Sequence, residues 1–200
     1  MSPQQPAKTV EFFFDYGSPT TYLAWTQLPA IAARAGAVIV RRPMLLGGVF
    51  KATGNASPAT VPAKALYMNR DMARFAARYG VPLRFNPHFP INTLNLMRGA
   101  VAATDAGREK EYDAAVFRAM WVEERDMGQQ SEVASVLASI GWDAGDFAAR
   151  IASDTVKERL KANTGEAIAR GAFGAPTFFV GGEMFFGQDR LDFVAEALAR

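Results

Sequence analysis

The chain contains no cysteine and only one histidine, His88. Without cysteine it has no disulfide framework, no thiolate metal ligand and no redox couple carried by its own side chains. This excludes disulfide oxidoreductase activity. A single histidine also argues against a histidine-rich metal centre, so we expect no metal site. Because His88 is flanked by Pro87 and Pro90, we interpret it as a turn residue and not as a general base.

Excess charge and long apolar runs are absent as well. The 22 basic and 20 acidic side chains nearly balance and are scattered along the chain. This distribution does not predict a nucleic-acid partner, although it allows a pocket for a small anion. No stretch reaches membrane-spanning length, and residues 1–9 hold no apolar run typical of a signal peptide, so we expect a cytoplasmic protein. Half of the 200 residues are apolar, which is enough for a substantial core.

The first 44 residues predict a strand, a helix and a second strand. Residues 10–14 form a short, aromatic-rich run that predicts a buried strand. Ser18 is expected to be the N-cap of the following helix, with Pro19 at its first position. Residues 38–40 predict a second buried strand. A helical crossover of this length favours parallel pairing of the two strands.

The middle of the chain changes character. The glycines and prolines of residues 45–58 predict a long irregular loop. Apolar side chains then recur at helical spacing in five segments. Ser131 and Asp154 are candidate N-caps of the last two. The five segments cover residues 68–79, 94–101, 112–121, 131–140 and 154–170.

Strand signals return at residues 176–180 and 183–186, and Gly181-Gly182 between them predicts an antiparallel hairpin. A final helix follows. This order of elements is that of an α/β thioredoxin-like domain, here residues 1–44 and 172–200. An all-helical insertion of residues 45–171 would carry a loop for a ligand.

Ser18 is the main candidate for chemistry. A helix start presents free N–H groups and favours negative charge, so it can hold a thiolate and lower the pKa of the thiol. Since the chain has no thiol of its own, that thiol would have to come from a ligand. The alternative is that Ser18 only caps the helix, and the residue alone does not decide between these readings.

A second candidate is Pro176, which precedes a strand expected at the centre of the sheet, where proline is normally excluded. It suggests a cis peptide bond that leaves the backbone of Ala175 free to pair with an extended peptide. The simpler alternative is an ordinary proline that ends a loop.

Several charged and amide side chains match a tripeptide that carries an amine, two carboxylates and a thiol. Cations would hold the carboxylates, an acid would hold the amine, and an amide would donate between them. Taken singly, such side chains are usually just solvated. The candidates are Lys51, Asn55, Lys64, Asp189 and Arg190.

These motifs together resemble a known family, over nearly the full length of the chain. The chain resembles 2-hydroxychromene-2-carboxylate isomerases, relatives of kappa-class glutathione transferases within the thioredoxin-like proteins. The family commonly has a larger residue at the position of Ala175. The resemblance is carried by Phe14-Asp15-Tyr16-Gly17-Ser18-Pro19, the stretch from Pro43 to Asn55, Pro62-Ala63-Lys64, the stretch from Phe173 to Phe178, and the stretch from Phe186 to Leu191.

The resemblance implies a glutathione-dependent isomerase of naphthalene-type catabolism. Such an enzyme interconverts 2-hydroxychromene-2-carboxylate and trans-o-hydroxybenzylidenepyruvate, so its substrate is a small aromatic carboxylate. Ser18 would hold the glutathione sulfur, with Lys51 and Tyr16 at the substrate. The expected glutathione contacts are Ala175 and Pro176 at the backbone, Asn55 and Lys64 at one part of the tripeptide, and Gln188, Asp189 and Arg190 at the γ-glutamyl end.

Two other functions stay open at this point. A kappa-type glutathione transferase or peroxidase would consume glutathione instead of returning it. A non-catalytic glutathione- or peptide-binding module would use only the exposed backbone beside Pro176. Relatives also suggest a homodimer.

Overall fold

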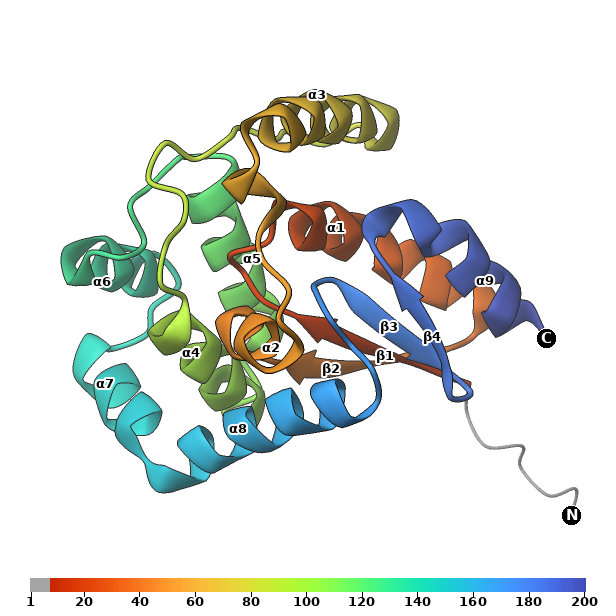
Figure 1. Ribbon diagram of the computed structural model, residues 1–200. Coiled ribbons are helices and arrows are strands. Elements are labelled where there is room, and N and C mark those ends of the chain that lie inside the picture. Colours follow the sequence, from red (N-terminus) through yellow and green to blue (C-terminus); the bar gives the residue numbers. More distant parts are fainter. Residues whose placement is uncertain (1–7) are drawn as a thin grey trace, which may run out of the picture.

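The computed structural model describes residues 8–200, so most of the polar start, residues 1–7, lies outside the described part. A four-stranded sheet is combined with helices on both of its faces (Figure 1). In chain order the elements are β1 (Thr9–Phe14), α1 (Pro19–Ala35), β2 (Val38–Pro43), α2 (Leu46–Thr53), η1 (Pro58–Thr60), α3 (Pro62–Tyr79), α4 (Leu94–Asp105), α5 (Glu109–Trp121), α6 (Gln130–Ser139), α7 (Ala144–Ala152), α8 (Asp154–Ala169), β3 (Thr177–Val180), β4 (Glu183–Phe186), η2 (Gln188–Arg190) and α9 (Leu191–Ala199).

The sheet has the strand order β2-β1-β3-β4. β1 and β2 are parallel, as the helical crossover predicts. β3 is antiparallel to both β1 and β4, so the hairpin at Gly181-Gly182 is confirmed. β3 therefore lies inside the sheet, directly after Pro176. The thioredoxin-like α/β arrangement with inserted helices is confirmed.

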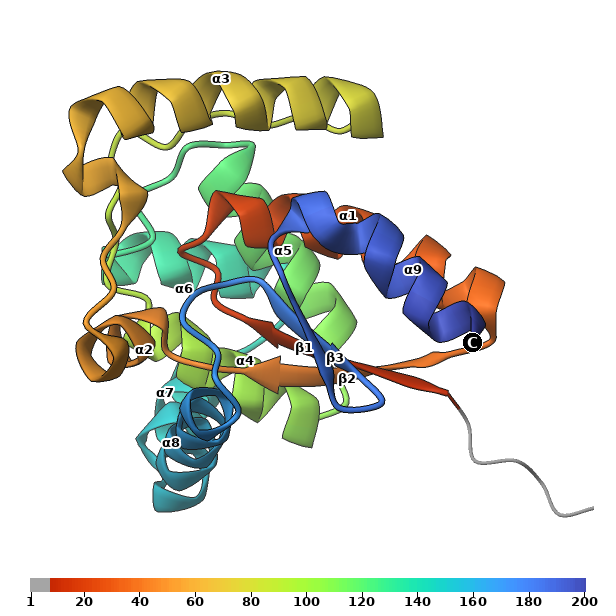
Figure 2. The same ribbon diagram turned by 45° about the vertical axis from the view of Figure 1, so that its right-hand side comes forward.

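Alternate residues of β1 face opposite sides of the sheet. Phe12 and Phe14 join the large apolar core under α1 and α9, and Phe13 joins a smaller core under α2 and α8. Figure 2 shows α1 and α9 above the sheet and α8 below it. The larger core also includes Tyr112 and Trp121 of the insertion. The division at residues 45 and 171 thus stays a prediction, since one core spans sheet and insertion.

The predicted loop at residues 45–58 is partly wrong, because Leu46–Thr53 forms α2. Its glycines lower helix propensity, but Gly48 allows a close approach to α8: a Cβ there would lie 3.3 Å from the Thr164 side chain. Tertiary packing therefore overrides local propensity. Figure 2 shows the chain leaving α2 and rising along one end of the fold to α3.

Two predicted helix caps are also wrong. Gln129, not Ser131, is the N-cap of α6, and its side chain makes no capping bond. Ser153 caps α8 through the N–H of Val156, while Asp154 occupies the first turn, where its charge favours the helix dipole. Neighbouring polar residues compete for a cap, and the backbone path decides between them. Within residues 8–200, no helix combines the length and apolarity needed to cross a membrane.

Candidate active site

Ser18 begins α1 as predicted. Its backbone is extended, and its Oγ accepts a hydrogen bond from the N–H of Thr21 at 3.2 Å. Pro19 follows at the first helical position, where its missing N–H removes no helical hydrogen bond. The capping reading is therefore confirmed. It does not exclude the second reading, because a hydroxyl has a proton to donate besides its acceptor sites.

The Ser18 hydroxyl lies against the loop that enters β3. Its Oγ donates to the carbonyl oxygen of Ala175 at 3.0 Å, and the hydroxyl of Thr20 donates to the same oxygen at 3.2 Å. The Ala175–Pro176 peptide bond is cis, which confirms that prediction. The fold thus joins Ser18 to Ala175 across 157 residues. Sequence reasoning missed Thr20, although it stands two residues after Ser18.

A buried carboxylate, Asp15, holds this corner in place. Its Oδ1 accepts from the N–H of Gly17 at 2.9 Å and its Oδ2 from the N–H of Leu46 at 2.8 Å. Burial raises the pKa of Asp15, while the N–H groups of Leu46 and Gly17 and the hydroxyl of Thr93 pull this pKa down. No site role was predicted for Asp15. The available signal was an acid directly after a buried strand.

Asn55 lies beside the loop that enters β3. Its Nδ2 donates to the carbonyl oxygen of Phe173 at 2.8 Å, which brings the end of α2 beside the segment just before Ala175. Asn55 itself is exposed. Lys51 and Lys64 are exposed on α2 and α3, and the described contacts do not join either of them to Ser18.

The residues predicted to hold the γ-glutamyl end follow a segment that is hydrogen-bonded to Pro176. The N–H of Gly187 donates to the Pro176 carbonyl oxygen at 3.0 Å, and η2 follows at once. Gln188 is buried, and its backbone carbonyl oxygen accepts a hydrogen bond from the phenol of Tyr79. Asp189 and Arg190 are exposed and pair with each other at 2.7 Å.

Lys64 lies near the other end of the same helix. It precedes Tyr79 by 15 residues in α3, so the two are separated by about 22 Å along the helix axis. Since Tyr79 contacts Gln188, Lys64 and η2 lie toward opposite ends of α3. The sequence analysis assigns them to different parts of the tripeptide, and that assignment stays a prediction.

Tyr16 faces the interior and not the surface. It has no exposed area, and its phenol donates to Asp113, which also pairs with Arg41. Burial, with Asp113 next, raises the pKa of the Tyr16 phenol well above its usual value. The structure therefore does not support the expected contact of this side chain with a substrate. Its carbonyl oxygen is equally engaged, by the indole N–H of Trp121.

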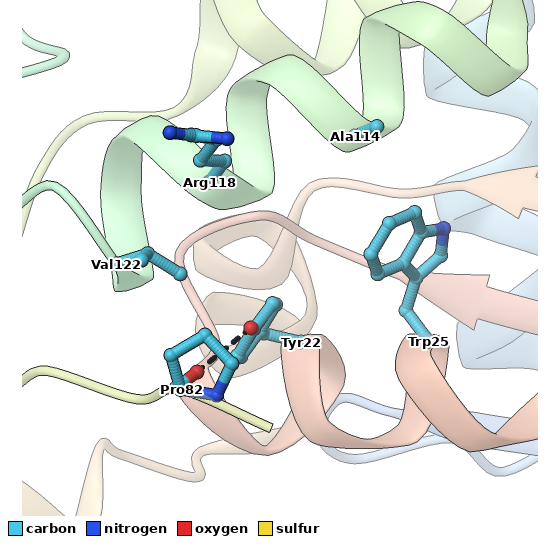
Figure 3. A pocket seen from close by; sticks show the side chains of 6 residues that line it. All are labelled: Tyr22, Trp25, Pro82, Ala114, Arg118 and Val122. Carbon is cyan, nitrogen blue, oxygen red and sulfur yellow. Dashed lines mark hydrogen bonds between the residues drawn. The ribbon is translucent and has the colours of Figure 1, made fainter. Parts of the chain in front are cut away.

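A pocket of about 230 Å³ lies between α1 and α5 (Figure 3). Tyr22 and Trp25, one and two turns after Ser18, form one wall, and their rings are stacked. The phenol of Tyr22 donates to the Pro82 carbonyl at 2.8 Å, which fixes the ring. Arg118 stands at the edge of the pocket and pairs with Glu123. The walls are mainly apolar, which suits a planar organic group.

The family model for DSBA-like thioredoxin domains matches residues 9–199. A 2-hydroxychromene-2-carboxylate isomerase of Sphingobium xenophagum is 34% identical over 193 residues, which cover 96% of this chain and 98% of that protein. A solved structure of selenomethionine 2-hydroxychromene-2-carboxylate isomerase has a TM-score of 0.86 and 33% identity, and the match covers 96% of this chain and 95% of that chain.

A kappa-class glutathione transferase is a more distant relative. Glutathione S-transferase kappa 1 of Rattus norvegicus is 28% identical over 205 residues, which cover 96% of this chain and 91% of that protein. The resemblance seen in the sequence motifs is thereby confirmed over almost the whole chain. The chain belongs to the 2-hydroxychromene-2-carboxylate isomerase family, within the DSBA-like thioredoxin fold.

Proposed function

We propose that this protein is a glutathione-dependent isomerase that interconverts 2-hydroxychromene-2-carboxylate and trans-o-hydroxybenzylidenepyruvate. The single observation that carries the proposal is the junction of Ser18 with the Ala175 carbonyl at the start of α1. A hydroxyl, the positive end of the α1 dipole and peptide backbone meet there in a chain without cysteine. The name of the relative at 34% identity supports isomerase activity, and the name of the relative at 28% identity supports the use of glutathione.

The cluster fits the chemistry of glutathione. Ser18 would turn its hydroxyl proton from Ala175 to the sulfur, and the N-terminus of α1 would favour the thiolate over the thiol. The Ala175 carbonyl, still bonded to Thr20, would then use its second lone pair to accept an N–H from the tripeptide backbone. Asn55 and Lys64 would hold one part of the tripeptide, and Gln188, Asp189 and Arg190 would hold the γ-glutamyl end.

The hemiketal ring first opens by loss of its ring C–O bond and gives an enone. Bound glutathione supplies a thiolate that adds reversibly to the double bond of this enone, so that the bond becomes single, rotates and is restored. The contribution of the protein is to bind, orient and balance charge. Ser18 donates to the sulfur and lowers the pKa of the thiol. Lys51 would neutralise the substrate carboxylate or the negative charge that develops on its carbonyl oxygen. Trp25 and Tyr22 would offer flat apolar walls to the aromatic ring.

The activity is tested by incubating the protein with hydroxychromene-carboxylate, with and without glutathione, and following the absorbance of the benzylidenepyruvate. The proposal requires acceleration that depends on glutathione while the amount of glutathione stays constant. Stoichiometric loss of glutathione with an electrophile would favour the kappa-type transferase or peroxidase. Binding without any turnover would favour the non-catalytic module.

The role of Ser18 has its own test. Ser18→Ala should raise the pKa of the bound thiol and slow turnover at neutral pH by roughly tenfold, because it removes a hydrogen bond to a charged group. The thiolate absorbance of the bound ligand, titrated against pH, reports that pKa. Ser153→Ala is the matched control, since Ser153 caps α8 and donates to the Arg150 carbonyl but is not a candidate site residue. Identical pH profiles for Ser18→Ala and the unmodified protein would contradict the assigned role.

We further propose that the protein acts as a homodimer, as the family resemblance suggests, and that it does so in the cytoplasm, as expected from the sequence. Size-exclusion chromatography with light scattering at several protein concentrations measures the oligomeric state. A mass of one chain, 21.7 kDa, at all concentrations would overturn the dimer.

A further inference from the structure

Asp15 lies where three segments of the chain meet. Its two carboxylate oxygens accept N–H groups from Gly17, in the corner before α1, and from Leu46, the first residue of α2. Thr93, the N-cap of α4, packs against the same corner, and its hydroxyl helps to lower the pKa of Asp15. Asp15 is only 1% exposed. A single carboxylate therefore links the corner before α1 to the start of α2 in the interior, beside the start of α4.

The chemistry of this junction favours an acidic side chain. The first N–H groups of a helix have no partner inside the helix, and Asp15 satisfies that of Leu46. A carboxylate can accept on both oxygens at once, whereas an amide has only one oxygen. Space is also restricted, since a Cβ at Gly17 would lie 3.1 Å from the Thr93 side chain. The corner thus has little freedom to move away from Asp15.

The two N–H bonds connect the two walls of the proposed glutathione site. The corner bonded through Gly17 continues directly into Ser18. The helix bonded through Leu46 carries Lys51 and ends just before Asn55. A tripeptide that contacts both walls binds tightly only if their spacing is fixed before it arrives, because ordering them on binding would cost affinity.

We propose that Asp15 is a positioning residue that holds the Ser18 corner and α2 at a fixed spacing and thereby sets the affinity for glutathione. This inference rests on the proposed function. Asp15 touches neither glutathione nor substrate in this arrangement and acts only through Gly17 and Leu46. Its loss should therefore affect glutathione binding far more than the chemical step.

The link itself is tested without any ligand, by amide hydrogen exchange. Asp15→Asn keeps the size of the side chain but leaves one of the two N–H groups without an acceptor. We expect faster exchange across α2 and the corner, and unchanged exchange in α7. Asp143→Asn is the matched control, because Asp143 caps α7 through one N–H, that of Asp146, which the remaining amide oxygen can still accept, so exchange should stay unchanged in both α7 and α2. Unchanged exchange of α2 in Asp15→Asn would overturn the link.

Glutathione affinity is tested by calorimetry and by steady-state kinetics on the same variants. Asp15→Asn should raise the Kd and the KM for glutathione about tenfold, while kcat at saturating glutathione stays within about twofold of the unmodified protein. A merely structural role would lower the folded fraction, and hence kcat, and leave KM unchanged, which would overturn the proposal. Faster α2 exchange in a protein that binds no glutathione would overturn the proposed function and leave the link intact.

Discussion

Tyr16 and Ser18 are two residues apart in the same corner, but their side chains have opposite environments. The Ser18 hydroxyl lies where the corner meets the Ala175 loop, whereas the Tyr16 phenol points into the core toward Asp113. Asp113 also accepts from the Nε of Arg41 at 2.8 Å. Tyr16 therefore stabilises the corner through its buried bond to Asp113, and Ser18 is the residue placed to contact a ligand.

Replacing Tyr16 tests whether its side chain stabilises the fold or contacts a ligand. Tyr16→Phe removes one of the donors to Asp113 and should lower the free energy of unfolding by about 1–3 kcal/mol. The KM for the aromatic acid should stay the same, because the ring has no exposed area. Urea unfolding and steady-state kinetics measure the two quantities. Tyr67→Phe, on an exposed side chain of α3, should change neither. A raised KM with unchanged stability would restore the substrate contact that the sequence suggested.

The residues that the sequence placed correctly are those whose role depends on their immediate neighbours. The cap at Ser18 and the cis bond at Pro176 follow from short local patterns. The burial of Tyr16 does not, since its partner Asp113 is 97 residues away. Asp15 was missed for the same reason, because its partner Leu46 lies 31 residues away and belongs to a helix that the sequence did not predict.

At the scale of elements, the helices of the insertion approach one another closely at Gly99. This residue lies in the middle of α4, and a Cβ there would overlap the phenol of Tyr112 in α5 and lie 2.7 Å from the ring of Phe147 in α7. The Tyr112 phenol donates to the Leu96 carbonyl of α4 at 3.1 Å, so it cannot simply turn away. The contact between three helices thus depends on a missing side chain.

This contact reverses the usual effect of an alanine substitution in a helix. Gly99→Ala should destabilise the protein by about 1–3 kcal/mol, because the gain in helix propensity is smaller than the cost of overpacking. Gly165→Ala is the matched control in α8, where a Cβ would meet nothing within 4 Å. There the substitution should stabilise by about 0.5–1 kcal/mol. Thermal unfolding of both variants decides the matter, and equal shifts of Tm would contradict the packing argument.

Periodicity predicted most helices of the insertion, since each has an apolar stripe. It did not predict α7, nor α2, which contributes only Val49 to the buried set and contains two glycines. Its stability comes from packing on α8 and from the Asp15 bond at its start, and both lie far away in sequence. This matters for the site, because α2 carries Lys51 and leads to Asn55.

For the whole molecule, the order of elements was enough to predict the sheet and its strand directions. It did not show that the sheet and the insertion share one core. Charged contacts also join them: Glu11 of β1 bonds to Arg170 at the end of the insertion at 2.8 Å and to Arg42 of β2 at 3.3 Å. Arg170 also lies over the ring of Phe179 in β3. Glu11 thus couples three parts of the fold.

This cluster gives a pH dependence that can be measured. The hydrogen bond from Arg170, with Arg170 and Arg42 as nearby charges, holds the pKa of Glu11 below its usual 4.5 although burial opposes it. The stabilisation by Glu11 is therefore present above about pH 4.5, and it is lost as the pH falls through the lowered pKa of the folded state. Glu11→Gln should be less stable than the unmodified protein at pH 7, and the difference should shrink toward pH 3.

The comparison must be between variants, because buried acids act in the opposite direction. Burial raises the pKa of Asp15 and of Asp113, so protonation of these two groups favours the folded state as the pH falls. Their contribution is common to both proteins and cancels in the difference. Urea unfolding at pH 3, 4, 5 and 7 measures that difference. Glu158→Gln, at an exposed pair with Lys161, should show almost none. A gap for Glu11→Gln that stays constant with pH would mean that Glu11 acts through packing and not through its charge.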